Sequence, residues 1–229
     1  MTDAKFFKHP FYSEREQLVY GEIGRDLDQL ETILEQLYSP CQVKIMNANL
    51  SNKDLTIQDI LNMEQKHRQD IVGAILYNDG LWRIEAAYLM LSIGFLNTAF
   101  SNLRSCLESV VAANIAENID EEAVNFLNGK KIDPTKLNGA INKDYYQQIK
   151  EMRERLGEWG VHSNIVSTRF GILGPNTFDK MISKVNNPRP QSLTPGFNEA
   201  AIDCVRAINS VFVVFMFLIS RGRLSDRHR

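Results

Sequence analysis

The sequence predicts an all-α protein, an up-and-down bundle of long helices with an irregular segment near residues 163–194. Apolar side chains recur at alternating intervals of three and four over residues 20–37 and again over residues 145–159, which is typical of helices that pack lengthwise on a neighbour. The N-terminal half contains no useful length of the polar–apolar alternation that marks a half-buried strand. Residues 163–194 are rich in Asn, Gly, Pro and Ser, which favours turns.

The first predicted helix covers residues 13–38. Ser13 followed by Glu16 has the pattern of a capping box, and Ser39-Pro40 is expected to end the helix because a proline disfavours helical backbone in the residue before it. Residues 41–54 are predicted to be a polar connection. The apolar stripe of this helix comprises Tyr20, Ile23, Leu27, Leu30, Leu34 and Leu37.

A second helix is expected to begin at Thr56, with Asp59 completing its first turn. Asn78-Asp79-Gly80 is predicted to be a turn. A further helix is expected over residues 82–118, with a bend at Gly94. The stripe of the second helix comprises Ile57, Ile60, Glu64, His67, Ile71 and Ala74 or Ile75.

In the C-terminal half, residues 128–139 are predicted to be a loop, within which Asp133-Pro134 forms a cap and first turn. Thr194-Pro195 is expected to start a long final helix that Gly222 ends. Between them, a helix from Lys143 presents the stripe Tyr145, Ile149, Met152, Leu156 and Trp159. Because the composition is even along the chain, we expect one domain over residues 1–229.

The composition is that of a globular protein, with 44% hydrophobic and 24% charged residues and a formal net charge of -2. A protein that coats duplex DNA non-specifically is usually more basic. The three cysteines, Cys41, Cys106 and Cys204, show no CxxC spacing, which indicates neither a zinc site nor a disulfide framework. We expect a cytoplasmic location, because the chain also shows no export signal.

Two apolar runs require comparison with a membrane span, which needs roughly 20 apolar residues. Residues 86–103 carry no formal charge but contain six polar or glycine positions, and residues 207–220 are more apolar but shorter. Both runs are interpreted as buried core helices, and contact with a membrane is not expected. The alternative that remains is a C-terminal anchor over residues 207–220.

Two further sequence patterns could indicate a chemical site. Glu64 and His67 form an ExxH, the spacing used in carboxylate-bridged metal sites of helical bundles, but a second ExxH is missing. We therefore expect no metal and no other cofactor, and we interpret the pair as polar neighbours. Cys106 lies among Leu103, Leu107 and Val110, which favours a core thiol over a nucleophile.

The strongest candidate site is the segment "KEMRERLGEWGVHSN", residues 150–164. Arg155 and His162 are seven residues apart, so a continuous helix would place both side chains on one face. Guanidinium and imidazole together suit phosphodiester cleavage, because the imidazole moves a proton near neutral pH and the guanidinium holds phosphate oxygens. Gly157 and Gly160 weaken the helix between them, each by up to about 1 kcal/mol relative to alanine.

On this Arg–His spacing the chain resembles the HEPN (higher eukaryote and prokaryote nucleotide-binding) superfamily of α-helical bundles. Residues 102–118, with Arg104 and Glu108 one turn apart, are similar to a helix of several HEPN-like proteins. The resemblance implies a HEPN-like core over residues 80–222 with N-terminal helices 13–77 packed on it. Leu156 departs from the family pattern, in which a polar residue often follows the motif arginine.

The resemblance implies a metal-independent ribonuclease, or an RNA- or nucleotide-binding protein of a defence or toxin type. Arg155 and His162 would be catalytic, His162 as acid/base and Arg155 on the phosphate. The supporting residues would be Arg153, Glu158, Arg104 and Glu108. It also implies a homodimer, in which each protomer supplies part of the site, and an antitoxin or other protein partner.

The same residues also fit a non-catalytic role. Arg155 would then be a solvated arginine, and His162 would close a helix C-terminus, where an imidazolium is favourable and Glu158 is one turn away. The alternative function is therefore a helical interaction or scaffold protein.

Overall fold

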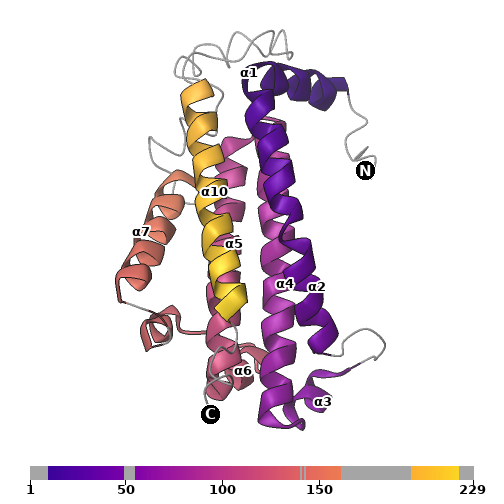
Figure 1. Cartoon of the computed structure of the whole chain (residues 1–229), viewed down its shortest axis with the longest axis vertical. Coiled ribbons are helices and arrows are strands. Elements are labelled where there is room, and N and C mark those ends of the chain that lie inside the picture. Colours follow the sequence, from indigo (N-terminus) through magenta and orange to yellow (C-terminus); the bar gives the residue numbers. More distant parts are fainter. Residues whose placement is uncertain (1–9, 49–54, 140, 142, 161–196, 222–229) are drawn as a thin grey trace.

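All regular elements in the described part of the chain are helices, as predicted. The computed structural model describes residues 10–48, 55–139, 141, 143–160 and 197–221. The elements are α1 (Pro10–Glu35), α2 (Tyr38–Asn47), α3 (Ile57–Leu61), α4 (Gln65–Ser92), α5 (Leu96–Asn118), α6 (Asp120–Leu127), the 3-10 helix η1 (Pro134–Gly139), α7 (Lys143–Gly160) and α10 (Phe197–Arg221). Figure 1 shows the long helices side by side along one axis, with α7 at the flank. The predicted irregular segment 163–194 lies outside the described residues.

The centre of the bundle is an antiparallel pair of helices, α4 and α5. The helix predicted for residues 82–118 is wrong, because the chain reverses between these two helices instead of bending. Gly94 adopts a φ of +78°, its N–H donates to the carbonyl of Leu91 at 2.9 Å, and the N–H of Phe95 donates to that of Met90 at 2.8 Å. These two bonds form a Schellman motif, which satisfies the last carbonyls of α4 and requires a left-handed residue.

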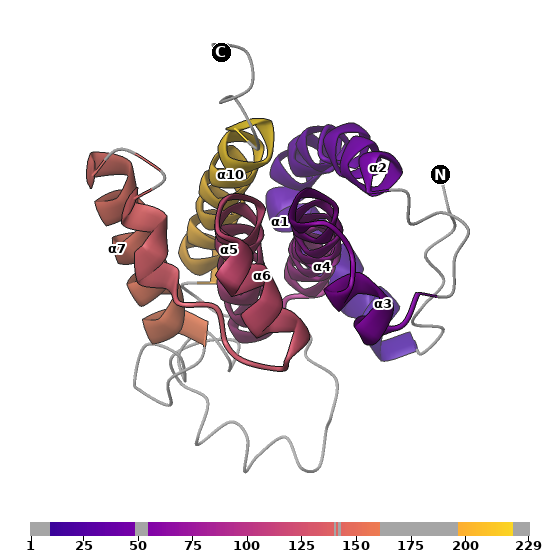
Figure 2. The ribbon, with the colours of Figure 1, turned by 90° about the horizontal axis from the view of Figure 1, so that it is seen from below.

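Helix α5 is enclosed by its neighbours. It packs on α4, α6, α7, α10 and η1, and Figure 2 shows it between α7 and α4. Its fully buried residues recur on several sides of the helix: Ala99, Phe100, Leu103, Cys106, Ala113, Ile115 and Ala116 are each 0% exposed. A helix that is apolar on more than one face is stable in water only when other helices cover it.

The predicted turn at Asn78-Asp79-Gly80 is also wrong, because these residues lie within the continuous helix α4. Gly80 is buried, and a Cβ placed on it would lie 2.7 Å from Cγ2 of Val110 and 3.3 Å from Cε1 of Phe215. The glycine is therefore needed for the close approach of α5 and α10 to α4. The local turn signal is overridden by tertiary packing.

The N-terminal helices differ from prediction in several places. Ile23 interrupts α1 with non-helical backbone, and this kink accompanies burial of Val19 while Tyr20, predicted in the core, is 53% exposed. The predicted connection 41–54 is wrong in its first part, because α2 occupies Tyr38–Asn47. Ser39-Pro40 lies inside the first turn of α2, where proline is tolerated.

The predicted helix start at Thr56 is confirmed. The Thr56 hydroxyl accepts a hydrogen bond from the N–H of Asp59 at 3.2 Å, and the Asp59 carboxylate accepts one from the N–H of Thr56 at 2.9 Å. The helix α3 is nevertheless short, and α4 starts afresh after it. Ile57 is 58% exposed, and Glu64 and His67 are also exposed, so these three residues are not on the buried stripe.

Helix α10 is joined to α4 and α5 at its C-terminal end. The Leu218 carbonyl, in the last turn where helix carbonyls lack internal partners, accepts hydrogen bonds from the Tyr77 hydroxyl at 3.1 Å and the Asn114 amide at 3.3 Å. Among the described helices, α10 alone has the length and apolar character to cross a membrane. It buries a continuous stripe of side chains against the bundle, and the core helices of soluble proteins can be equally long and apolar.

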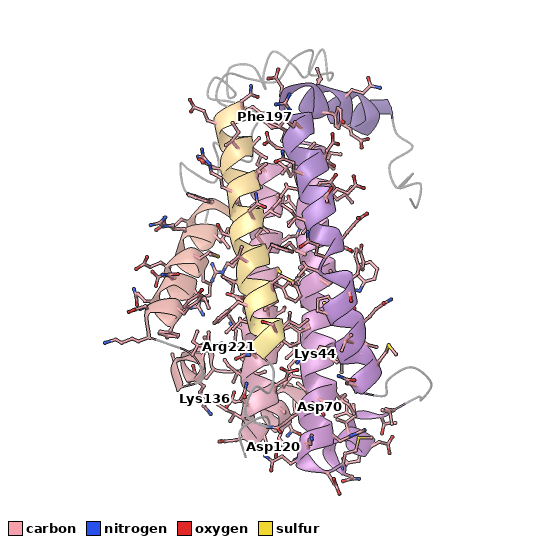
Figure 3. All side chains as sticks on the ribbon, viewed as in Figure 1. Lys44, Asp70, Asp120, Lys136, Phe197 and Arg221 are labelled. Carbon is pink, nitrogen blue, oxygen red and sulfur yellow. The ribbon has the colours of Figure 1, made fainter. Side chains whose placement is uncertain are left out.

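A buried ion pair links α2 to α5. Lys44 donates to the carboxylate of Glu117, whose side chain is 2% exposed, and Figure 3 shows Lys44 at about the level of Arg221 along the bundle. Gly73 of α4 makes room for this carboxylate, since a Cβ there would lie 2.5 Å from Cγ of Glu117. A buried charge is tolerated because it is paired.

Replacing Gly80 with alanine tests the close approach of the three helices. We expect Gly80→Ala to lower the free energy of unfolding by about 1–3 kcal/mol through overpacking, measured by urea denaturation. Gly21→Ala is the matched control, because a Cβ on this exposed helical glycine meets nothing within 4 Å. The free energy of unfolding of this control should rise by up to about 1 kcal/mol, because alanine has a higher helix propensity than glycine. Equal stability of the two variants would contradict the packing account.

Candidate functional site

Helix α7 remains helical past Gly157 and packs antiparallel on α5. It extends to Gly160, with Ile149 and Leu156 buried at 4% and 1% exposure. Trp159 meets Phe100 of α5 edge to face, with ring centroids 5.0 Å apart. The stripe predicted for this helix is therefore confirmed at Ile149 and Leu156, whereas Tyr145 is 39% exposed.

The buried Gly157 allows an arginine of α5 to lie against α7. A Cβ at this position would be 2.3 Å from Nη1 of Arg104, so the guanidinium occupies the space that any other side chain would fill. Arg104 also donates from Nε to Glu108, one turn further along α5, at 3.1 Å. The absence of a side chain at Gly157 thus leaves room for the Arg104 guanidinium against α7.

A cleft opens beside this contact, with a volume of about 720 Å³. Its walls are α5 and α7, and α4, α6 and residues 129–137 complete it. Six of its lining side chains are cationic and one, Glu108, is anionic. The six cations are Arg83, Arg104, Lys130, Lys131, Lys150 and Arg153. In a chain whose net charge is -2, this is a strong local concentration of positive charge.

Two of these cations are held by carboxylates and the others are not. Arg83 donates from Nε to Asp79 at 2.7 Å, and the Ser109 hydroxyl donates to the same carboxylate oxygen at 2.5 Å. Arg104 is paired with Glu108, as described above. Within the described part of the chain, Lys130, Lys131, Lys150 and Arg153 form no ion pair. Unpaired cations around one hollow favour an anionic ligand.

The segment that carries Lys130 and Lys131 is anchored by the buried carboxylate of Glu122. Glu122 accepts hydrogen bonds from the backbone N–H of Asp133 at 3.1 Å and from Lys136, and its side chain is 3% exposed. Figure 3 shows Lys136 in the short helical turn near the start of α7. Burial alone would raise the pKa of the Glu122 carboxyl, but the hydrogen bonds and charge of Lys136 and the Asp133 N–H bring the pKa below its usual 4.5.

The turn before this segment also has a defined cause. Gly129 adopts a φ of +74°, and the N–H of Lys130 donates to the carbonyl of Asn125 at 2.8 Å, which ends α6 in a second Schellman motif. The predicted cap at Asp133 is confirmed, because its carboxylate accepts a hydrogen bond from the N–H of Thr135 at 2.9 Å. The lysines therefore extend from a segment fixed at both ends.

Among the predicted site residues that the structure describes, three lie together at the cleft and two do not. Arg104, Glu108 and Arg153 line the cleft. Arg155 and Glu158 are exposed and do not line it. Arg155 lies about 200° around α7 from Arg153, because each residue turns the helix by about 100°. His162 lies outside the described residues, so its distance from Arg155 remains a prediction.

Sequence reasoning missed four residues of the cleft: Arg83, Lys130, Lys131 and Lys150. The Lys130-Lys131 pair gave a local signal, as two adjacent cations in a predicted loop, and so did Lys150, one helical turn before Arg153 in the segment 150–164. Arg83 belongs to α4, which is far from α7 in the sequence, and it joins the cleft only after the bundle forms.

The other two patterns weighed for chemistry lie apart from the cleft. Glu64 precedes α4 and His67 is in its first turn, both exposed, and the described residues contain no cluster of three or more His, Cys, Asp or Glu side chains arranged for a metal. Cys106 is 0% exposed, and burial raises the pKa of its thiol far above the ordinary value. The interpretation of Cys106 as a core thiol is confirmed.

The Glu122 anchor predicts a pH dependence. Because the folded-state pKa of Glu122 lies below 4.5, its ionised form stabilises the fold above that pH, and this contribution is lost as the pH falls through the folded-state value. We expect Glu122→Gln to lower the free energy of unfolding by about 1–3 kcal/mol at pH 7, and the difference from the wild type to shrink in acid.

Urea unfolding at several pH values measures this difference. Glu121→Gln is the control, since the Glu121 side chain is 78% exposed and 3.9 Å from Lys136. This substitution should change the free energy of unfolding little at any pH. A Glu122→Gln effect that is the same at neutral and acid pH would contradict the role of the carboxylate charge.

Comparison with known proteins identifies no relative of the chain. Among protein families, curated proteins and solved structures, none matches the chain. What stands is an all-helical bundle with a cationic cleft between α5 and α7.

Proposed function

We propose that this protein is HEPN-like and binds RNA or a nucleotide through its phosphate at the cationic cleft between α5 and α7. The observation that supports the proposal is the convergence of six lysine and arginine side chains on one hollow, where Gly157 leaves room for the Arg104 guanidinium. Arginine offers a planar fork that matches phosphate oxygens, and lysine supplies further positive charge.

The proposal includes ribonuclease chemistry at the end of α7. His162 would move the proton and Arg155 would hold the phosphate, without a metal or other cofactor. In this arrangement the cleft would bind one part of the RNA, while the exposed Arg155, on another face of α7, would meet the phosphate that is cleaved. The predicted antitoxin or protein partner and cytoplasmic location belong to the same proposal.

Self-association is the remaining part of the proposal. Helix α10 leaves Val213 58% exposed and Ile202 37% exposed, which supports a further contact there, although other helices also carry exposed apolar side chains, such as Trp82 at 66%. The alternative function, a non-catalytic helical interaction protein, rests on the same surface. Sedimentation velocity tests the composite site of the ribonuclease proposal, because a strict monomer could not assemble it.

The test is binding and degradation of a fluorescent single-stranded RNA in the presence of EDTA. We expect Arg153→Met to weaken binding and to reduce the slope of log affinity against log salt by about 0.7, the share of one phosphate contact on a single strand. The matched control is Arg206→Met, an exposed arginine of α10 outside the cleft. Equal losses in both variants would contradict the assignment of the cleft.

Degradation is followed on the same samples. His162→Ala should slow RNA cleavage by about 100-fold or more, as loss of a general acid or base does, while His67→Ala, an exposed histidine of α4, should leave it unchanged. Equal cleavage by the wild type and His162→Ala, or none by either at high protein concentration, would remove the ribonuclease activity. Binding at the cleft would then be the whole function.

A further inference from the structure

The cleft has an apolar floor beneath its cationic rim. Its lining includes Val111, Ile115, Phe126, Ile132, Tyr146 and Ile149. These side chains come from α5, α6, α7 and the 129–137 segment, so the floor exists only in the folded bundle. Val111, Ile115, Ile132 and Ile149 are buried, whereas Phe126 and Tyr146 are half-buried, so these two aromatic side chains supply most of the apolar surface that a ligand can reach.

The floor is unnecessary for binding a phosphate backbone alone. Contact with the phosphates alone needs only Lys and Arg side chains. A concave, mostly apolar hollow with a few convergent polar groups is typical of small-molecule sites, whose volumes run from about 300 to 1,000 Å³. At about 720 Å³, the cleft falls within that range.

The cationic groups are placed to hold one end of such a molecule. The Arg104 guanidinium lies against Gly157, and Arg153 is one turn before Gly157 on the same face of α7, so both arginines line the cleft. Lys150 lies a further turn before Arg153 on the same helix and lines the same cleft. Two guanidinium groups and an ammonium suit a doubly charged phosphate, because each supplies a charge-assisted hydrogen bond.

We propose that the cleft binds a small phosphomonoester whose other end is apolar. The phosphate lies among Arg104, Lys150 and Arg153, and the apolar ring or chain lies on the floor formed by α5, α6 and residues 129–137. This inference rests on the proposed function in taking the cleft as a phosphate site, and it adds that the ligand is selected by its apolar end.

Calorimetric titration of the wild-type protein with phenyl phosphate, ribose 5-phosphate and inorganic phosphate tests the inference. Phenyl phosphate and ribose 5-phosphate carry the same phosphate group, the first on an apolar ring and the second on a polar ring. We expect phenyl phosphate to bind at least about tenfold more tightly than ribose 5-phosphate, because one ring face buried on the floor removes enough apolar surface from water. Adenosine monophosphate, added as a fourth ligand, shows whether a base ring uses the floor as phenyl does.

Two variants test where the phosphate and the apolar end of the ligand bind. Gly157→Ala should weaken all of these ligands, because its Cβ displaces the Arg104 guanidinium, while Gly21→Ala should not. Ala112→Leu fills part of the cleft from α5, so it should reduce phenyl phosphate affinity to that of ribose 5-phosphate and leave inorganic phosphate unchanged. Thermal melts of each variant show that the fold is retained.

The outcomes separate the inference from the function on which it rests. Equal affinity of the wild type for phenyl phosphate and ribose 5-phosphate overturns the apolar selection, and this result needs no variant. If RNA binding still depends on Arg153 in that case, the proposed function stands without the inference. Absence of binding by every phosphate ligand and by RNA overturns both.

Discussion

Three glycines that face side chains of α5 set how closely the bundle can pack. Gly73 and Gly80 of α4 lie against Glu117 and Val110, and Gly157 of α7 lies against Arg104. At each position a Cβ would approach the α5 side chain to 2.7 Å or less. Interiors are packed as densely as organic crystals, so such contacts do not relax without moving a helix or a side chain. At Gly157 the facing group is the flexible end of Arg104, which can move, unlike a helix. The contact between Gly157 and Arg104 borders the cleft.

The same constraint explains which parts of the fold are readable from the sequence. The stripes of α1 and α7 predict helices correctly because heptad spacing reports the buried face directly. Asn78-Asp79-Gly80 has the local pattern of a turn, yet Gly80 lies within α4 because α5 and α10 require the space. Gly157 has the propensity of a helix weakener, yet α7 continues past it and the glycine makes room for Arg104. A glycine that serves a distant contact and a glycine that makes a turn look alike in a single sequence.

The candidate site was partly predictable for a related reason. Arg104 and Glu108 are one turn apart on a single helix, and their ion pair follows from that spacing. Arg153, close to the motif in sequence, was included as a supporting residue and proves to line the cleft. Lys150 is one turn before Arg153 on the same helix, so its spacing indicates it, whereas Arg83 joins the cleft only through the packing of α4 on α5. The predicted centre of the site, Arg155, lies instead on an exposed face of α7.

The central claim is that the phosphate of a ligand lies between Arg104 and Arg153, and a crystal structure of the protein with bound adenosine monophosphate tests it most directly. The account predicts phosphate oxygens within hydrogen-bond distance of both guanidinium groups and the base on the floor of the cleft. A nucleotide bound beside Arg155, or elsewhere on the bundle, with the cleft empty would contradict it.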